Sequence, residues 1–199
     1  MSSINIEYNL KEINQIVMMN ILKMLYRRKL INSYDDEYSK LNFENNSIVE
    51  INLNNNKICS IYFLNIKLTT ITQNTPLDEF LSNNDNIKIV IAKEVAKKVV
   101  KQILTDYKNA EFFFEHEMME DIPSKHFIPE HQLLNIEEKA EILTKFSEYE
   151  FSRILVTDAM SRYYGAKIGD IFRIIRPSFT AGKSIFYRRV VNGSIDILF

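Results

Sequence analysis

The residues whose types and spacing come closest to a catalytic motif are Gly182-Lys183-Ser184, which match the last three positions of a phosphate-binding loop. That loop follows the pattern Gly-x-x-x-x-Gly-Lys-Ser/Thr, so a further glycine is needed at position 177. Pro177 stands there and removes a backbone donor that the phosphate needs. A helix must also follow, to present its N-terminus to the phosphate, whereas residues 185–190 have the pattern of a strand. The sequence therefore argues against nucleotide binding at this loop.

Metal-dependent nuclease chemistry is a second candidate. Such nucleases place a carboxylate on one strand and a Glu/Asp-x-Lys motif on the next, so that a divalent cation is held against a phosphate. Glu50 lies in the first predicted strand, and Asn65-Ile66-Lys67 ends the second. Asn65 replaces the required carboxylate, and a neutral amide is a poor ligand for a hard cation. We therefore expect no nuclease activity.

A metal site built on histidine is a third candidate, because all three histidines have acidic neighbours. The histidines are His116, His126 and His131, and the neighbours are Glu115, Glu117 and Glu130. No cysteine accompanies them, and their spacings match no zinc signature. We expect ordinary surface or turn histidines, with no metal and no cofactor.

The C-terminal third is better suited to binding a partner. Eight basic and two acidic residues lie between positions 153 and 189, which gives a local net charge of +6. Arginine offers a rigid fork of donors, and Tyr and Arg often anchor interfaces. We predict a docking surface that includes Arg176, Thr180, Gly182, Tyr187 and Arg188. The alternatives are that the charges form a solvated face, that Gly182 only turns the chain, and that Tyr187 belongs to the core.

Composition limits the class of protein. The chain has 199 residues, of which 46% are hydrophobic and 26% charged, which is typical of folded domains. Binding to nucleic acid without sequence preference requires positive charge to neutralise phosphates. The net charge of the chain is −1, so we do not expect the chain as a whole to bind in this way. No apolar run approaches the roughly 20 residues of a membrane span, and we expect no signal peptide. The single Cys59 lies in an apolar stretch, so we expect a small core residue in a reducing compartment.

The elements that position these residues fall into two groups, and the first is an α/β unit. Apolar spacing predicts a helix over residues 10–30 and a short helix beginning near residue 35. A hairpin of strands over 47–53 and 57–64, turning at three asparagines, follows. The remaining elements are a helix beginning near Thr75, a strand over 87–92, a helix over 93–107 and a strand over 111–116. The polar segment around Pro123 marks a domain boundary, so we predict one domain over residues 1–121.

The second group, residues 122–199, predicts a small α+β unit. Asn135 is expected to cap a helix that runs to about Phe146, and Thr157-Asp158 a helix that ends at Gly165. Gly169 opens a strand that Pro177 is expected to end, and a return strand follows the loop. Ile195, Ile197 and Phe199 alternate in the tail, which can add an edge strand or contact a partner. The whole chain is therefore predicted to be α+β.

A series of motifs in fixed order gives this second unit a family resemblance. They are Pro129-Glu130-His131, Arg153-Ile154, Asp158 with Arg162-Tyr163-Tyr164-Gly165, Gly169, Ile174, Arg176-Pro177-Ser178, Thr180-Ala181-Gly182 and Tyr187-Arg188-Arg189-Val190. In these residues the chain resembles the fifth-largest subunit of the eukaryotic nuclear RNA polymerases, a family that includes the smaller H polypeptide of archaeal polymerases. Ala159-Met160 and Phe151-Ser152 replace the family's Pro-hydrophobic and Leu-Pro pairs, which indicates a diverged member. The Asn, Ile and Lys content favours an A/T-rich source such as a large DNA virus.

The resemblance implies a non-catalytic subunit of a multisubunit DNA-directed RNA polymerase. It implies that residues 1–121 form a jaw domain with an endonuclease-like fold near downstream duplex DNA. It implies that residues 122–199 form an assembly domain, similar to the archaeal H polypeptide, that docks on the largest subunit. The partner-binding residues are then Arg153, Arg162, Tyr163, Arg176, Ser178, Thr180, Gly182, Tyr187 and Arg188.

Jaw contacts to DNA are expected to be phosphate contacts without sequence preference. The residues we expect to make them are Arg27, Arg28, Lys93, Lys97, Lys98 and Lys101. The complex is expected inside the cell: in the nucleus if the source is cellular, in the virion and host cytoplasm if it is viral. The alternatives are a free-standing nucleic-acid-binding protein derived from an endonuclease-like fold, and an assembly adaptor with no DNA nearby.

Overall fold

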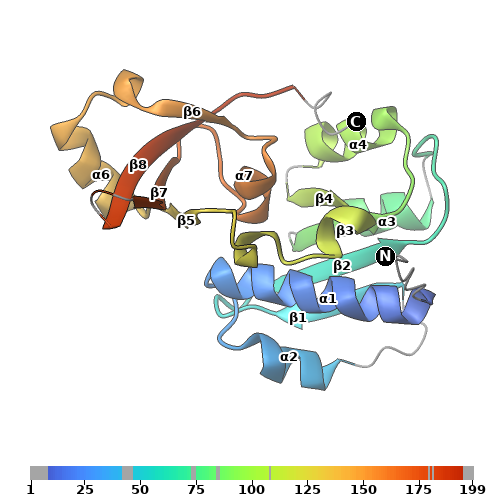
Figure 1. Ribbon diagram of the computed structural model, residues 1–199. Coiled ribbons are helices and arrows are strands. Elements are labelled where there is room, and N and C mark those ends of the chain that lie inside the picture. The colour runs from blue at the N-terminus through green and yellow to red at the C-terminus, as the bar shows by residue number, and fades with distance from the viewer. Residues whose placement is uncertain are drawn as a thin grey trace, which may run out of the picture. The chain divides into compact units, whose positions relative to one another are not determined.

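The fold is that of a computed structural model, which describes residues 9–41, 47–72, 75–83, 86–107, 109–178, 180 and 182–194. The chain is α+β, as predicted, and divides into two compact units between Glu120 and Asp121 (Figure 1). Among the described residues, no helix has the length and apolar character needed to cross a membrane. The predictions for Ile195, Ile197 and Phe199 concern residues outside the described part of the chain.

The N-terminal unit is built on a four-stranded sheet with the order β1-β2-β3-β4. Its strands are β1 (Ile48–Asn52), β2 (Ile58–Leu64), β3 (Ile87–Ala92) and β4 (Ala110–Phe114). Strands β1 and β2 form the predicted antiparallel hairpin, whereas β2 with β3 and β3 with β4 pair in parallel. Asn56 in the hairpin turn has a φ of 60°, a left-handed conformation that Asn tolerates well.

The described part of this unit contains five helices, and both faces of the sheet are covered. They are α1 (Leu10–Arg27), α2 (Tyr34–Lys40), α3 (Pro76–Ser82), α4 (Lys97–Asp106) and α5 (Glu115–Met118). The two parallel crossovers run through α3 and α4, which therefore lie on one face, while α1 covers the other (Figure 1). A capping box between Asn9 and Glu12 starts α1, whose Val17, Ile21 and Leu25 are fully buried.

Three predicted boundaries in this unit were wrong. Helix α1 ends at Arg27 and not at residue 30, because Lys29 takes a left-handed φ of 60°. A long-range contact explains the start of α4, and a local hydrogen bond explains the end of β4. Helix α4 begins at Lys97 and not at residue 93, because Val95 pairs with Leu68 in a parallel bridge first. Strand β4 ends at Phe114, because the Glu117 carboxylate accepts the Phe114 backbone N–H at 2.8 Å and starts α5.

The C-terminal unit has its own four-stranded sheet, with the order β5-β7-β8-β6. Its strands are β5 (Glu130–Leu133), β6 (Ser152–Leu155), β7 (Ile171–Ser178) and β8 (Gly182–Val191). Only the β6–β8 pair is parallel. The sequence did not predict β5 or β6. Pro177 does not end β7, because Ser178 continues the strand opposite Gly182.

Helices of the C-terminal unit begin and end close to the predicted residues. Asn135 caps α6 (Ile136–Lys145) in a capping box with Glu138, and Asp158 caps α7 (Ala159–Tyr163). The described part of the unit also contains two short 3-10 turns, Ile122–Ser124 and Glu148–Glu150. Gly165 has a φ of 62° just after α7, as expected for a glycine that stops a helix.

The two faces of this second sheet bury separate cores, because successive strand residues point to opposite sides. One core contains Ile154, Ala166, Phe172, Ile174 and Val190. The other contains Leu134, Ile142 and Ile171, with Ile142 supplied by α6.

Candidate partner-docking surface

The β7–β8 hairpin becomes more exposed from its base toward its turn. Ile171 and Phe172 at the base are fully buried, whereas Pro177, Thr180 and Gly182 at the turn are exposed. Gly182 has a φ of 69°, and a Cβ added there would meet nothing within 4 Å. The glycine is therefore required by backbone conformation and not by crowding. The hairpin end presents its side chains to solvent within this unit.

Arg176, Phe186 and Arg188 share one face of the hairpin. In the register of the ladder, Ser184 lies opposite Arg176, Ile174 opposite Phe186, and Phe172 opposite Arg188. The Arg176 guanidinium lies over the Phe186 ring, 5.2 Å from its centroid, and that ring is 48% exposed. The buried Nε of Arg176 has no hydrogen-bond partner among the described residues.

His131 lies on the same face, opposite Ile174 in the β5–β7 ladder. Its Nδ1 is 2.7 Å from the Pro129 carbonyl oxygen, and its ring meets Phe172 edge-on at 5.8 Å. Burial is the main cause that lowers the pKa of His131, and the charges of Arg188 and Arg176 add to it. The Pro129 hydrogen bond and Asp158 act in the opposite direction. The histidine is therefore half-buried, and its hydrogen bond and ring contact give it a structural role.

Tyr187 points to the opposite face. It lies opposite Arg173 and packs against Phe151, with ring centroids 6.0 Å apart. Its side chain is half-buried beside the second core. On this same face, the Arg173 guanidinium pairs with Glu138 at 3.3 Å. The structure therefore separates Tyr187 from Arg176 and Arg188 and gives it a packing role.

The remaining predicted docking residues have different surroundings. Arg153 is exposed on β6, opposite Arg189. Ser178 ends β7, where its hydroxyl lies 3.4 Å from that of Thr180. Arg162 is half-buried on α7. Tyr163 was predicted to contact a partner, but it lies in the interior of the unit. It is 2% exposed, and its hydroxyl donates to Asp121 at 3.3 Å.

The sequence reasoning missed two apolar side chains at the end of the hairpin. Ile185 is 55% exposed and Phe186 is 48% exposed. A signal was present, because Ile185-Phe186-Tyr187 puts three large apolar residues in a row, whereas a half-buried strand alternates. Ile185 and Phe186 lie on opposite faces of the strand, and neither of them belongs to either core.

The predicted DNA-proximal residues lie on two sides of the N-terminal sheet. Lys97, Lys98 and Lys101 are exposed along α4, and Lys93 is exposed in the bend before it. Arg27 ends α1, on the opposite side of the sheet (Figure 1). Arg28 donates to both carboxylate oxygens of Glu111, at 2.8 and 2.7 Å. Its side chain is only 7% exposed, so Arg28 is an internal ion-pair residue.

The structure also includes the residues whose sequence comes closest to a phosphate-binding or metal-binding motif. A strand, β8, follows Gly182-Lys183-Ser184, where a phosphate-binding loop requires a helix. Among the described residues, no group of three or more His, Cys, Asp and Glu could hold a metal ion. Cys59 is fully buried, as predicted, and burial raises the pKa of its thiol to about 12.

Comparison with known proteins agrees with the resemblance seen in the motifs. A family model described as "RNA polymerase Rpb5, C-terminal domain" matches residues 120–190. The chain is 31% identical to DNA-directed RNA polymerase subunit 5 of Acanthamoeba polyphaga mimivirus, over 89% of this chain and 91% of that protein. It is 29% identical to the Dictyostelium discoideum subunit rpabc1 of RNA polymerases I, II and III, over 92% of this chain and 100% of that protein. Subunit Rpo5 of Aeropyrum pernix is 37% identical over 42% of this chain and 86% of its own length. The chain therefore belongs to the family of RNA polymerase subunit 5.

Proposed function

We propose that this protein is a non-catalytic subunit of a multisubunit DNA-directed RNA polymerase. The observation that carries the proposal is the mimivirus relative, a polymerase subunit that is similar over nearly the whole chain and not over the C-terminal unit alone. Synthesis of RNA then belongs to other subunits, and this chain contributes contacts. Its partners are other polymerase subunits, and its location is that of the assembled enzyme inside the cell.

The C-terminal unit is proposed to dock on the largest subunit through one face of the β7–β8 hairpin. Arg176, Phe186 and Arg188 form a basic surface with an exposed aromatic ring at its centre. Arginine and aromatic residues are enriched among the residues that dominate binding energy. The net charge of +6 over residues 153–189 favours an acidic partner surface.

Copurification of the largest subunit with variants of the whole chain tests this docking. Arg176→Ala and Phe186→Ala should each weaken binding at least tenfold, because a central interface side chain is worth about 2 kcal/mol or more. Lys145→Ala is the matched control, since it removes an exposed cation of the same unit from α6, outside the basic segment. Full binding by both hairpin variants would exclude this face as the docking surface.

The N-terminal unit is proposed to form part of the jaw near downstream duplex DNA. Support comes from the lysine row of α4, defined as Lys97, Lys98 and Lys101. The first turn of α4 contains no acidic residue, although the N-terminus of a helix favours negative charge. Cations at this position weaken the helix, and binding to phosphates offsets that cost.

The alternatives make different predictions about where the protein is found. A polymerase of a cellular source places it in the nucleus, and a viral polymerase places it in the virion and host cytoplasm. A free-standing nucleic-acid-binding protein would purify alone. An assembly adaptor without DNA nearby would retain all DNA contacts of the enzyme when residues 1–121 are removed.

A further inference from the structure

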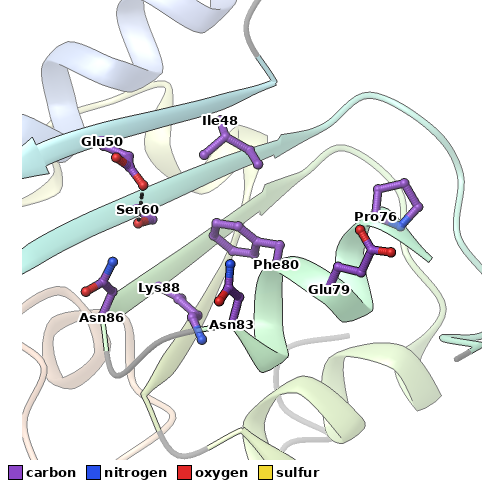
Figure 2. A pocket seen from close by; sticks show the side chains of 9 residues that line it. All are labelled: Ile48, Glu50, Ser60, Pro76, Glu79, Phe80, Asn83, Asn86 and Lys88. Carbon is purple, nitrogen blue, oxygen red and sulfur yellow. Dashed lines mark hydrogen bonds between the residues drawn. The ribbon is translucent and has the colours of Figure 1, made fainter. Parts of the chain in front are cut away.

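A pocket of about 290 Å³ lies beside the edge strand of the N-terminal sheet (Figure 2). Three cross-strand neighbours form one side of it: Glu50 of β1, Ser60 of β2 and Lys88 of β3. Helix α3 supplies Phe80, whose ring packs on Tyr62 with centroids 5.2 Å apart. The pocket has an aromatic wall and polar groups around it. Its volume lies just below the roughly 300–1,000 Å³ of small-molecule sites, and suits a single side chain.

The charge that this pocket presents to solvent is negative. Glu50 and Glu79 are both exposed at the pocket, and Figure 2 shows them on opposite sides of the Phe80 ring. Lys88 is 5% exposed, and its Nζ donates to the Leu81 carbonyl oxygen at 2.7 Å, so its charge is turned into the unit. The two carboxylates therefore determine which ligand the pocket attracts.

Ser60 adds a buried polar group at the base of the pocket. It is 5% exposed, and its hydroxyl donates to a Glu50 carboxylate oxygen at 3.4 Å, which is long for such a bond. The hydroxyl oxygen still has lone pairs for a donor that enters the pocket. Glu50 and Ser60 thus place two acceptors side by side, next to an aromatic ring (Figure 2).

We propose that this pocket binds an arginine side chain presented by a protein partner. A guanidinium carries several donors in a planar fork, which matches the adjacent acceptors of Glu50 and Ser60. Its methylene stem packs on apolar surface, here Phe80 and the exposed Ile48 at the edge of the sheet. Lysine offers a compact charge without the fork, so it fits less well.

The same two carboxylates disfavour binding of nucleic acid in this pocket. Glu50 and Glu79 repel phosphates, whereas the lysine row of α4 attracts them. Among the described residues β1 pairs only with β2, so its other edge can accept an extended segment. An arginine opposite Glu50 in such an added strand makes a favourable cross-strand pair.

Titration of the full chain with short peptides, followed by NMR, tests the proposal. The probe is an N-acetylated, C-amidated Gly-Arg-Gly peptide, and its neutral counterpart carries citrulline. The arginine peptide should shift the amide resonances of Ser60, Phe80 and Lys88 and bind at least tenfold more tightly than the citrulline peptide, since charge-assisted hydrogen bonds exceed neutral ones. Glu50→Gln should weaken the arginine peptide by about the same factor.

The matched control is Glu94→Gln, which removes the same charge from the exposed pair with Lys67 in the same unit. It should change binding less than about twofold. Equal binding of both peptides, an unaffected Glu50→Gln variant, or no shift in the pocket at millimolar peptide would each overturn the proposal. Competition by duplex DNA for the same resonances would assign the pocket to nucleic acid and overturn it as well. None of these outcomes bears on assembly with polymerase subunits, which copurification tests separately.

Discussion

At the scale of single residues, the contact between Arg28 and Glu111 ties the end of α1 to β4. Its two hydrogen bonds are 2.8 and 2.7 Å long, and the Arg28 side chain is 7% exposed. Glu111 is 30% exposed, so water compensates part of the charge that loss of the arginine uncovers. We expect Arg28→Ala to lower the free energy of unfolding by about 2 kcal/mol, less than for a fully buried pair.

Urea denaturation measures this change in the free energy of unfolding. A double variant separates the effect of the unpaired charge from the effect of lost packing. Arg28→Met combined with Glu111→Leu removes both charges and fills similar space, so it should recover more than half of the lost stability. A double variant as unstable as Arg28→Ala would show that packing, and not the unpaired charge, causes the loss.

His131 makes stability depend on pH in a predictable direction. Its pKa in the folded protein lies below the ordinary value of 6.5, chiefly because of burial. The unfolded chain therefore takes up a proton first as pH falls, so stability declines from about pH 6.5 downward until the folded protein also protonates. One proton limits the slope to about 1.4 kcal/mol per pH unit.

Thermal unfolding between pH 5.5 and 8 checks this expectation with His131→Asn. The variant keeps an amide for the Pro129 carbonyl but cannot titrate, so its stability should fall less steeply below pH 6.5 than that of the wild type. Parallel curves for the two proteins would assign the pH dependence to other groups.

At the scale of elements, the β7–β8 turn depends on a single glycine. Gly182 has a φ of 69° with open space around its Cα, so a side chain there costs only backbone strain. We expect Gly182→Ala to destabilise the protein by about 1–2 kcal/mol. Gly182→Asn should recover about half of this loss, because Asn tolerates left-handed backbone angles. Chemical denaturation of the wild type and the two variants compares their free energies of unfolding. Equal stability of all three would show that the backbone conformation at position 182 does not require glycine.

The lysine row of α4 gives the second prediction for an element. Lys97→Gln, Lys98→Gln and Lys101→Gln together should reduce the salt dependence of template binding by the assembled polymerase. For every phosphate that the variant no longer neutralises, the slope of log K against log salt should fall by about 0.9. The matched control is Lys11→Gln, Lys40→Gln and Lys57→Gln, which removes three exposed charges of the same unit away from α4 and from the Arg27 end of α1. An unchanged slope in the lysine-row variant would show that α4 does not touch DNA.

Elements with local signals were predictable, and elements that depend on distant partners were not. Thr75-Pro76, Asn135 and Asp158 start helices by chemistry confined to one turn. By contrast, β5 reads Glu-His-Gln-Leu and is a strand only because β7 pairs with it about 40 residues later. Strand β6 is equally short and lies at an edge of the sheet, where it pairs only with β8.

The docking residues show the same division. Arg176, Gly182 and Arg188 were predicted, and the hairpin places Arg176 and Arg188 on one face. Burial decides the other cases, because a sequence does not say which tyrosine a core will cover. Tyr163 is interior and Tyr187 half-buried, whereas Phe186 is exposed because the core ends before it. Whether these residues bind a partner stays a prediction.

At the scale of the whole molecule, the chain combines two units with different charge. The C-terminal unit has a strongly basic segment over residues 153–189, although the whole chain carries a net charge of only −1. Family membership extends over both units, because the mimivirus relative matches 89% of this chain. The division of labour, assembly by one unit and a jaw contact by the other, stays a proposal that rests on the family resemblance and on the lysine row of α4.

The most direct test of the central claim is affinity purification of the tagged chain from its native source, with mass spectrometry of the proteins that come with it. The account predicts the two large polymerase subunits in stoichiometric amounts, and their loss when Arg176 and Phe186 are both replaced by alanine. Recovery of the tagged chain alone, or with nucleic acid and no polymerase subunit, would contradict the account.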